Sequence, residues 1–301
     1  MKVIAIRFLG ILVVLVTAFA FLWFVHLHPE ITLTLKKTPI FTIVVIVLMY
    51  AGSISCLAFL LHVMLQLHGK SLSSSEYLLL TSYSSLSNFF GLGQSGPGVR
   101  AAYLKAKHAF PIRHFLFGTY IYSAWLIVFS GTMLISAWFS WWQSCLYAAI
   151  IIAICALLDL FVTGAKKIPL ALPNCKSRLV RMIFMTGVGT ALQVGFVTTA
   201  YFVELHTVDS NITINQAISF TGAANFSLFV SITPGAIGIR EAFLFMSQNI
   251  HGVSTETIAT ASALDRAVYF VVLALLGLLV LFTHAGQRFR QSGEVKSQGN
   301  P

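Results

Sequence analysis

Charged side chains are scarce in this chain. Asp, Glu, Lys and Arg together make up 9% of its 301 residues, whereas hydrophobic residues make up 57%. A typical soluble domain carries about 25% charged residues. Because so few charges cannot cover a protein of this size in water, the composition excludes a soluble protein and predicts a membrane protein.

Cysteine is sparse as well. The four cysteines have no C-x-x-C spacing, and three of them lie inside apolar runs. This placement favours packing roles over redox or metal chemistry. The nine histidines are scattered, and the pair His26 and His28 has no carboxylate or cysteine at ligand spacing. We therefore expect no metal and no other cofactor.

The motifs of common enzymes are missing. No Asp-x-Asp and no His-Glu-x-x-His occurs in the chain. The pattern formed by Gly91, Gly93 and Gly96 matches a dinucleotide-binding fingerprint, but it follows an apolar segment and not the strand of a soluble βαβ unit. The sequence therefore predicts neither nucleotide binding nor an enzyme.

Long apolar runs, in contrast, are abundant. A helix needs about 20 apolar residues to cross a bilayer, and six runs reach this length, at about 4–25, 40–66, 112–138, 142–163, 180–203 and 256–283. The first run contains a signal-peptidase-like sequence at Ala18-Phe19-Ala20 but continues to Val25, so we expect an uncleaved anchor. Two further regions, about 72–108 and 213–250, are apolar but interrupted by glycine and proline. We predict that each forms a re-entrant hairpin.

The basic residues predict how the chain lies in its membrane. A net charge of +10 does not indicate nucleic-acid binding here, because Lys and Arg lie at the ends of apolar runs and form no separate domain. With six spans and no crossing by either broken region, nearly all of them share one side. The positive-inside rule then places both termini in the cytoplasm, and we expect a bacterial inner-membrane protein. The polar residues Glu204, His206, Asp209 and Asn211 fall on the opposite side.

The two halves of the chain match in pattern when one is shifted by about 140 residues. Each half, 1–140 and 141–285, has three spans with a broken region between the second and the third, and a polar cytoplasmic tail follows at 286–301. Ser73-x-x-Glu76 falls on Thr213-x-x-Gln216, and both patterns predict helix capping boxes. Because three spans is an odd number, the second half must run inverted. The predicted fold is an all-α integral membrane protein of two inverted repeats.

The broken regions carry the candidate site residues. Breaks are expected around Gly96, Pro97 and Gly98, and around Pro234, Gly235 and Gly238. Each break is followed by Gly-x-Arg, ending at Arg100 in the first region and at Arg240 in the second. A guanidinium there suits a lipid phosphate, whereas the alternative is an interfacial arginine that reaches back to water. Asn88 and Asn225 are expected to hydrogen-bond the broken backbone or a substrate.

Two charges lie inside the last span. Asp265 and Arg266 come roughly ten residues after its start, where each charge costs about 2.5–3.5 kcal/mol. We therefore predict that Asp265 pairs with Arg240 and that Arg266 pairs with Glu241. The pairs are either lipid contacts or a structural ion-pair lock, and the residues leave both alternatives open.

The second broken region resembles a known family. The pattern S-x-T-P-G-x-x-G-x-R-E-A at Ser231 to Ala242 is similar to the signature of the lysylphosphatidylglycerol synthase transmembrane-region family, and NFFGLGQSGPGVRA at Asn88 to Ala101 resembles its first motif. The resemblance implies two inverted halves that handle phospholipids, with family-like functional positions at Arg100, Arg240, Glu241 and Arg266. In large members a soluble C-terminal domain makes the aminoacylated lipid. This chain ends about twenty residues after its last predicted span, so we expect no lysyl transfer.

These features lead to three functional hypotheses. The first is a flippase-like protein that binds an anionic phospholipid or a lipid-linked envelope intermediate and moves it between leaflets. The second is a non-transporting partner subunit of an envelope lipid or glycan synthase. The third is a membrane transferase acting on a lipid carrier, for which Glu241 and Asp265 are the candidate catalytic carboxylates.

Overall fold

The structure is a computed structural model, and it describes residues 36–66, 69–91, 95–136, 175–230, 233–236 and 238–297. All regular structure within these ranges is helical, and no strand occurs among them. This confirms the all-α class. The spans predicted at 4–25 and 142–163 lie outside the described residues.

Among the described residues, four helices are long and apolar enough to cross a membrane. They are α3 (Ile40–Gln66), α6 (Ile112–Ile135), α8 (Cys175–Val208) and α12 (Thr255–Ser297). The sequence predicts a span at each of these places, so four of the six expected spans are confirmed as helices of spanning length. By the length and composition of these helices, the chain is a multi-pass membrane protein.

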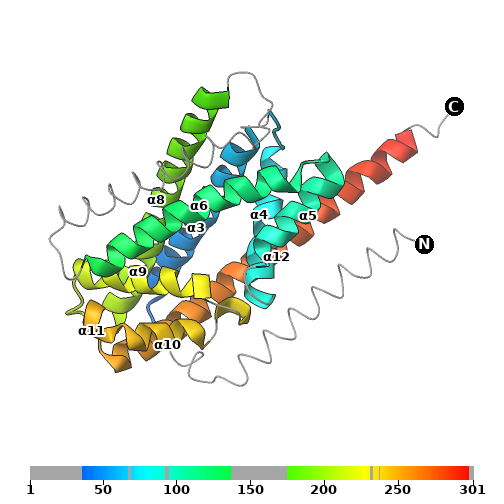
Figure 1. Cartoon of the computed structure of the whole chain (residues 1–301). Coiled ribbons are helices and arrows are strands. Elements are labelled where there is room, and N and C mark those ends of the chain that lie inside the picture. The colour runs from blue at the N-terminus through cyan, green and yellow to red at the C-terminus, as the bar shows by residue number, and fades with distance from the viewer. Residues whose placement is uncertain are drawn as a thin grey trace.

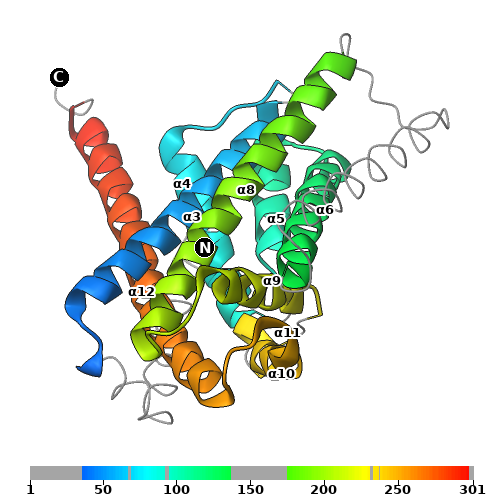
Figure 2. The same cartoon turned by 90° about the vertical axis from the view of Figure 1, so that its left-hand side faces the viewer.

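Helices α3 and α8 pack against each other along their length (Figures 1 and 2). A Cβ added to Gly52 would lie 2.7 Å from Phe196, and one added to Gly189 would lie 2.8 Å from Leu60. The residue numbers of these contacts rise on one helix as they fall on the other, so the helices are antiparallel. Glycines at such points let two helices approach closely, as is common in membranes.

The first broken region folds as two helices, α4 (Ser74–Phe90) and α5 (Gly96–His108), which pack against each other. The side chain of Asn88 accepts a hydrogen bond from the backbone N–H of Gly96 at 2.6 Å, and the Ser95 hydroxyl donates to the Ser87 carbonyl at 2.5 Å. Side chains at the end of α4 therefore satisfy backbone groups at the start of α5. Pro97 lies in the first turn of α5, where its missing N–H costs nothing.

The second broken region contains α9 (Ile214–Val230), the short 3₁₀ helix η1 (Pro234–Ala236), α10 (Ile239–Met246) and α11 (Gln248–His251). Gly235 and Gly238 have positive φ angles of 58° and 80°, a conformation that glycine adopts without a steric penalty. The chain therefore turns sharply between η1 and α10. In Figures 1 and 2, α9, α10 and α11 gather at one end of the bundle.

The two broken regions meet inside the protein. A Cβ added to Gly235 in η1 would lie 3.0 Å from the ring of Phe89, the penultimate residue of α4. The Phe89 ring also packs edge-on against Phe270 of α12, with centroids 4.9 Å apart. Helix α4 packs on α12, and α9 packs along α6. The first arm of each broken region thus contacts the last long helix of the other half.

The two predicted capping boxes differ. At the start of α9, the Thr213 N–H donates to Gln216 Oε1 at 2.9 Å and the Gln216 N–H donates to Thr213 Oγ1 at 3.4 Å, so this box is confirmed. At the start of α4, Ser73 Oγ accepts from the Glu76 N–H at 3.3 Å, but the Glu76 carboxylate does not return to Ser73. The reciprocal box predicted there is wrong, because the carboxylate has charged partners on α5.

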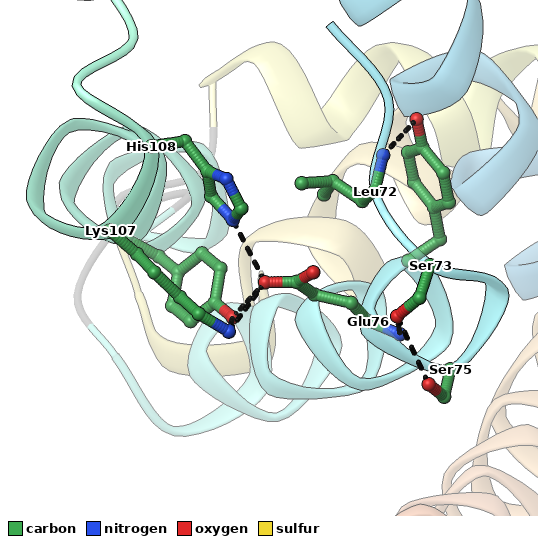
Figure 3. Close-up of polar contacts among 8 residues, drawn as sticks. Leu72, Ser73, Ser75, Glu76, Lys107 and His108 are labelled. Atoms are coloured by element: carbon green, nitrogen blue, oxygen red, sulfur yellow. Dashed lines mark hydrogen bonds and ion pairs between the residues drawn. The ribbon is translucent and has the colours of Figure 1, made fainter.

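Those partners join the beginning of α4 to the end of α5 (Figure 3). Glu76 Oε1 accepts hydrogen bonds from Lys107 Nζ at 2.8 Å and from the Tyr103 hydroxyl, and it contacts His108 Nε2 at 2.9 Å. Charge-assisted bonds of this kind are about twice as strong as neutral ones. The Glu76 carboxylate therefore holds the start of α4 against the end of α5.

Candidate functional site

A buried ion pair links α10 to α12. Arg240 Nη1 donates to Asp265 Oδ2 at 2.6 Å, and the two residues are only 7% and 2% exposed. The pairing predicted from sequence is therefore confirmed. Burying two charges is costly and becomes tolerable only when each has good partners, so further contacts to both groups are expected.

Two tyrosines supply those contacts. The Tyr50 hydroxyl on α3 donates to Asp265 Oδ1. The guanidinium of Arg240 lies over the ring of Tyr201 on α8, 5.0 Å from its centroid, a cation–π contact. The pair is thus held by four helices. Sequence reasoning missed both tyrosines, because a tyrosine inside an apolar run carries no signal for the face that it occupies.

The second predicted pair, Glu241 with Arg266, is also confirmed. Arg266 Nη2 donates to Glu241 Oε1 at 2.8 Å, and Arg266 Nη1 donates to the carbonyl of Gly235 at 2.6 Å. The other carboxylate oxygen of Glu241 accepts from the N–H of Gly238 at 2.7 Å. These bonds fix both sides of the turn between η1 and α10.

The two charges Arg240 and Glu241 of the second broken region and the two charges Asp265 and Arg266 of α12 thus have partners within the protein. The two ion pairs run between α10 and α12 and hold the turn in place. This arrangement has the geometry of an ion-pair lock. It leaves no guanidinium of this region without a carboxylate.

Arg100 of α5 has a different environment. Its Nε atom is buried without a hydrogen-bond partner, as is that of Arg240, but no ion pair joins Arg100 to a carboxylate among the described residues. The guanidinium interacts electrostatically with Tyr122 of α6, which shares a hydrogen bond with Gln193 of α8. Gln193 Oε1 is also buried without a partner. A guanidinium with spare donors in such a place is suited to an anionic ligand.

The predicted site residues do not form one cluster. Asn88 and Arg100 belong to the first broken region, and the Asn88 side chain is engaged with the backbone of Gly96. Asn225 is buried in α9, and its Nδ2 has no acceptor among the described residues. Gly96, Pro97 and Gly98 form the first turn of α5, whereas Pro234 and Gly235 lie in η1 and Gly238 precedes α10.

Glu204 is a buried charged residue that sequence analysis did not identify. The sequence places it among polar residues outside the membrane, but the structure buries it to 1% exposure near the end of α8. It interacts electrostatically with Asp265 and Arg240, and its Oε1 has no hydrogen-bond partner. Sequence analysis missed this burial, because a hydropathy pattern cannot show that Glu204 faces the protein interior while His206 and Thr207 beyond it are exposed.

Comparisons with known proteins do not assign this chain to a family. A scan against models of protein families finds no match for this chain, and a search of curated proteins finds no match either. Among the described residues, no three His, Cys, Asp or Glu side chains are grouped so that they could hold a metal ion. What the chain does must therefore be inferred from its own residues.

Proposed function

We propose that this chain is a bacterial inner-membrane protein that binds an anionic phospholipid or a lipid-linked envelope intermediate and moves it between leaflets. The observation that carries the proposal is Arg100. Its Nε is buried and unpaired, and no described carboxylate neutralises it. A ligand with a phosphate would supply the missing acceptor, because a guanidinium binds two phosphate oxygens at once.

The start of α5 adds to this site. Arg100 lies in the first turns of a helix that begins at Gly96, and the N-terminus of a helix carries partial positive charge. A Cβ added to Gly98 would meet no atom within 4 Å. This open space lies at the start of α5, on a different face of the helix from Arg100.

The arrangement of the described helices favours two inverted halves, each with a broken region between its two described long helices. Helices α3 and α8 correspond in the repeat, and they run antiparallel, as inverted copies must. The tips of the broken regions touch at Phe89 and Gly235. Inverted-repeat transporters place their substrate sites where such broken helices meet. Both features favour transport by a lipid-handling domain like that of the lysylphosphatidylglycerol synthase family.

Transfer of lipid in proteoliposomes tests the proposal. Wild-type protein should move labelled anionic phospholipid between leaflets faster than empty liposomes do, and Arg100→Ala should lower the rate toward that of empty liposomes. Arg113→Ala removes an exposed arginine at the start of α6, so it should keep the wild-type rate. Wild-type rates equal to those of empty liposomes for several anionic lipids would refute the function.

A second candidate is a partner subunit of an envelope lipid or glycan synthase. It is favoured by the ion pairs of the second broken region, which are complete without any ligand. In this case the protein should co-purify with one synthase, and the activity of that enzyme should survive Arg100→Ala. Lipid transfer that depends on Arg100 would favour the first candidate.

A further inference from the structure

Glu204 is a buried carboxyl group without a counter-charge of its own. Its side chain belongs to α8, about one turn before that helix ends at Val208. The residue is 1% exposed, and Oε1 has no hydrogen-bond partner. Groups of this kind are rare inside proteins, because an ionised carboxylate loses its hydration when it is buried.

Titratable and charged groups surround Glu204 from four helices. The groups that interact with it directly are Tyr50 of α3, Tyr201 of α8, Arg240 of α10 and Asp265 of α12. Arg266 and Tyr269 of α12 interact in turn with this shell. Arg266 already has Glu241 as its partner. Arg240 is therefore the one described cation that faces both Glu204 and Asp265.

The charges do not balance if both carboxyl groups are ionised. Arg240 donates to Asp265 at 2.6 Å, and the Tyr50 hydroxyl donates to the same carboxylate. Asp265 therefore has the contacts of an ionised group. An ionised Glu204 would leave the cluster with a net negative charge in a dry interior, and a buried group in that position takes up a proton instead.

We infer that Glu204 is a proton-binding site and that loss of its proton makes Glu204 compete with Asp265 for Arg240. In this step the O–H bond of the Glu204 carboxyl breaks and the proton passes to water at the nearby end of α8. The carboxylate gains one negative charge, and no other group changes its charge. Competition for Arg240 weakens the bridge that holds α10 to α12. A proton gradient would then be a source of energy for lipid movement, a step that rests on the proposed function.

Infrared spectroscopy of the full chain in lipid nanodiscs detects the proton directly. The wild type should show the carbonyl stretch of a protonated carboxyl group at neutral pH, and Glu204→Gln should lose it. Glu256→Gln, which changes an exposed residue in the first turn of α12, should keep it. A wild type without this band, or a band that survives in Glu204→Gln, would overturn the inference.

If Glu204→Gln does not fold, a second variant, Asp265→Asn, still tests the inference. Asp265→Asn frees Arg240 to pair with an ionised Glu204, so this variant should also lose the protonated band. Retention of the band in Asp265→Asn would show that Glu204 and Asp265 do not share Arg240, and the competition would be wrong.

The infrared experiment tests the proton site and the lipid-transfer experiment tests the proposed function, and each can give a negative result independently of the other. A protonated band without any lipid transfer would keep the proton site and refute the proposed function. Lipid transfer without the band would keep the function and refute the proton site. Where both hold, a pH gradient should change the transfer rate of the wild type and leave that of Glu204→Gln unchanged.

Discussion

At the scale of single residues, the bridge between Arg240 and Asp265 constrains how α10 and α12 pack. Both side chains are buried, and their contacts extend to α3 and α8 through Tyr50 and Tyr201. A buried pair of this kind adds little over an apolar replacement, but removing one partner leaves the other charge uncompensated. The pair therefore specifies how α10 meets α12 more than it stabilises the fold.

Replacing one residue of the pair should consequently lower the free energy of unfolding more than replacing both residues. We expect Arg240→Met to lower the free energy of unfolding by about 3–5 kcal/mol. The double variant Arg240→Met, Asp265→Leu should cost clearly less. Thermal or denaturant unfolding in detergent micelles measures both. A double variant that is less stable than Arg240→Met would contradict this account.

Glu76 predicts a dependence of stability on pH. Partial burial alone would raise the pKa of its carboxyl group, but hydrogen bonds from Lys107, Tyr103 and His108 outweigh burial and lower the pKa to about 2. A carboxyl group in an unfolded chain has a pKa of about 4.3. Because the folded pKa is the lower one, the stabilisation is complete above the unfolded value and is lost as the pH falls toward 2.

Glu76→Gln should therefore be less stable than the wild type at neutral pH, by about 1–2 kcal/mol. The difference should shrink between pH 4 and pH 2. Unfolding followed over this pH range measures it. Glu256→Gln, at an exposed position without a described ion pair, is the control and should stay close to the wild type throughout. A constant difference at all pH values would show that Glu76 acts through packing alone.

The sequence predicted the two ion pairs because buried charges require partners, and few candidates were available. It missed Glu204 for the opposite reason. Glu204 lies close to the polar Asp209 in the sequence, so hydropathy assigned it to the loop. Its burial depends on which face of α8 contacts α12, and that contact joins segments far apart in the chain.

At the scale of elements, the long apolar runs predicted where four helices lie, but they predicted the first and last residues of these helices less well. Helix α6 ends at Ile135, before the expected 138, and α8 runs from Cys175 to Val208, beyond both expected ends. Backbone hydrogen bonds continue a helix through polar residues that hydropathy counts as loop. The packing of α9 on α6 and of α4 on α12 could not be predicted, because no local pattern encodes which helices touch.

The turn between η1 and α10 depends on its glycines. Gly235 has a φ of 58° and touches Phe89, whereas Gly238 has a φ of 80° with nothing near its Cβ position. Gly238→Ala should cost about 1–2 kcal/mol from backbone strain alone. Gly235→Ala should cost more, because Phe89 must also move. Gly277→Ala, in open space on α12, should be neutral or slightly stabilising.

Unfolding of the three glycine variants in detergent tests the turn. A cost at Gly277 equal to that at Gly235 would mean that these substitutions report a general effect of the added methyl group. Equal costs at Gly235 and Gly238 would mean that the contact with Phe89 is too soft to hold the two broken regions together.

At the scale of the whole molecule, the antiparallel packing of α3 and α8 determines which ends share a side. Lys70 follows the end of α3, and Ser210 follows the end of α8. Because the helices run in opposite directions, these two exposed positions lie at opposite ends of the bundle. Lys70→Cys and Ser210→Cys, each in a background without the native cysteines, should react with a membrane-impermeant maleimide from opposite sides. Labelling of both from one side would refute the inverted arrangement.

Two more positions test whether the broken regions return to the side from which they enter. If α4 and α5 form a re-entrant hairpin, Lys105→Cys should label from the same side as Lys70→Cys. If α9 and α10 do the same, Glu256→Cys should label with Ser210→Cys. All four positions are exposed to solvent. A region that crossed the membrane once would place Lys105 opposite Lys70, or Glu256 opposite Ser210, and would contradict the contacts of Glu76 with Lys107 and of Gln216 with Gly252 that join the two ends of each region. The unpaired Arg100 would then lie on a continuous transmembrane path instead of in a hairpin that opens to one side, and lipid movement would require a different geometry.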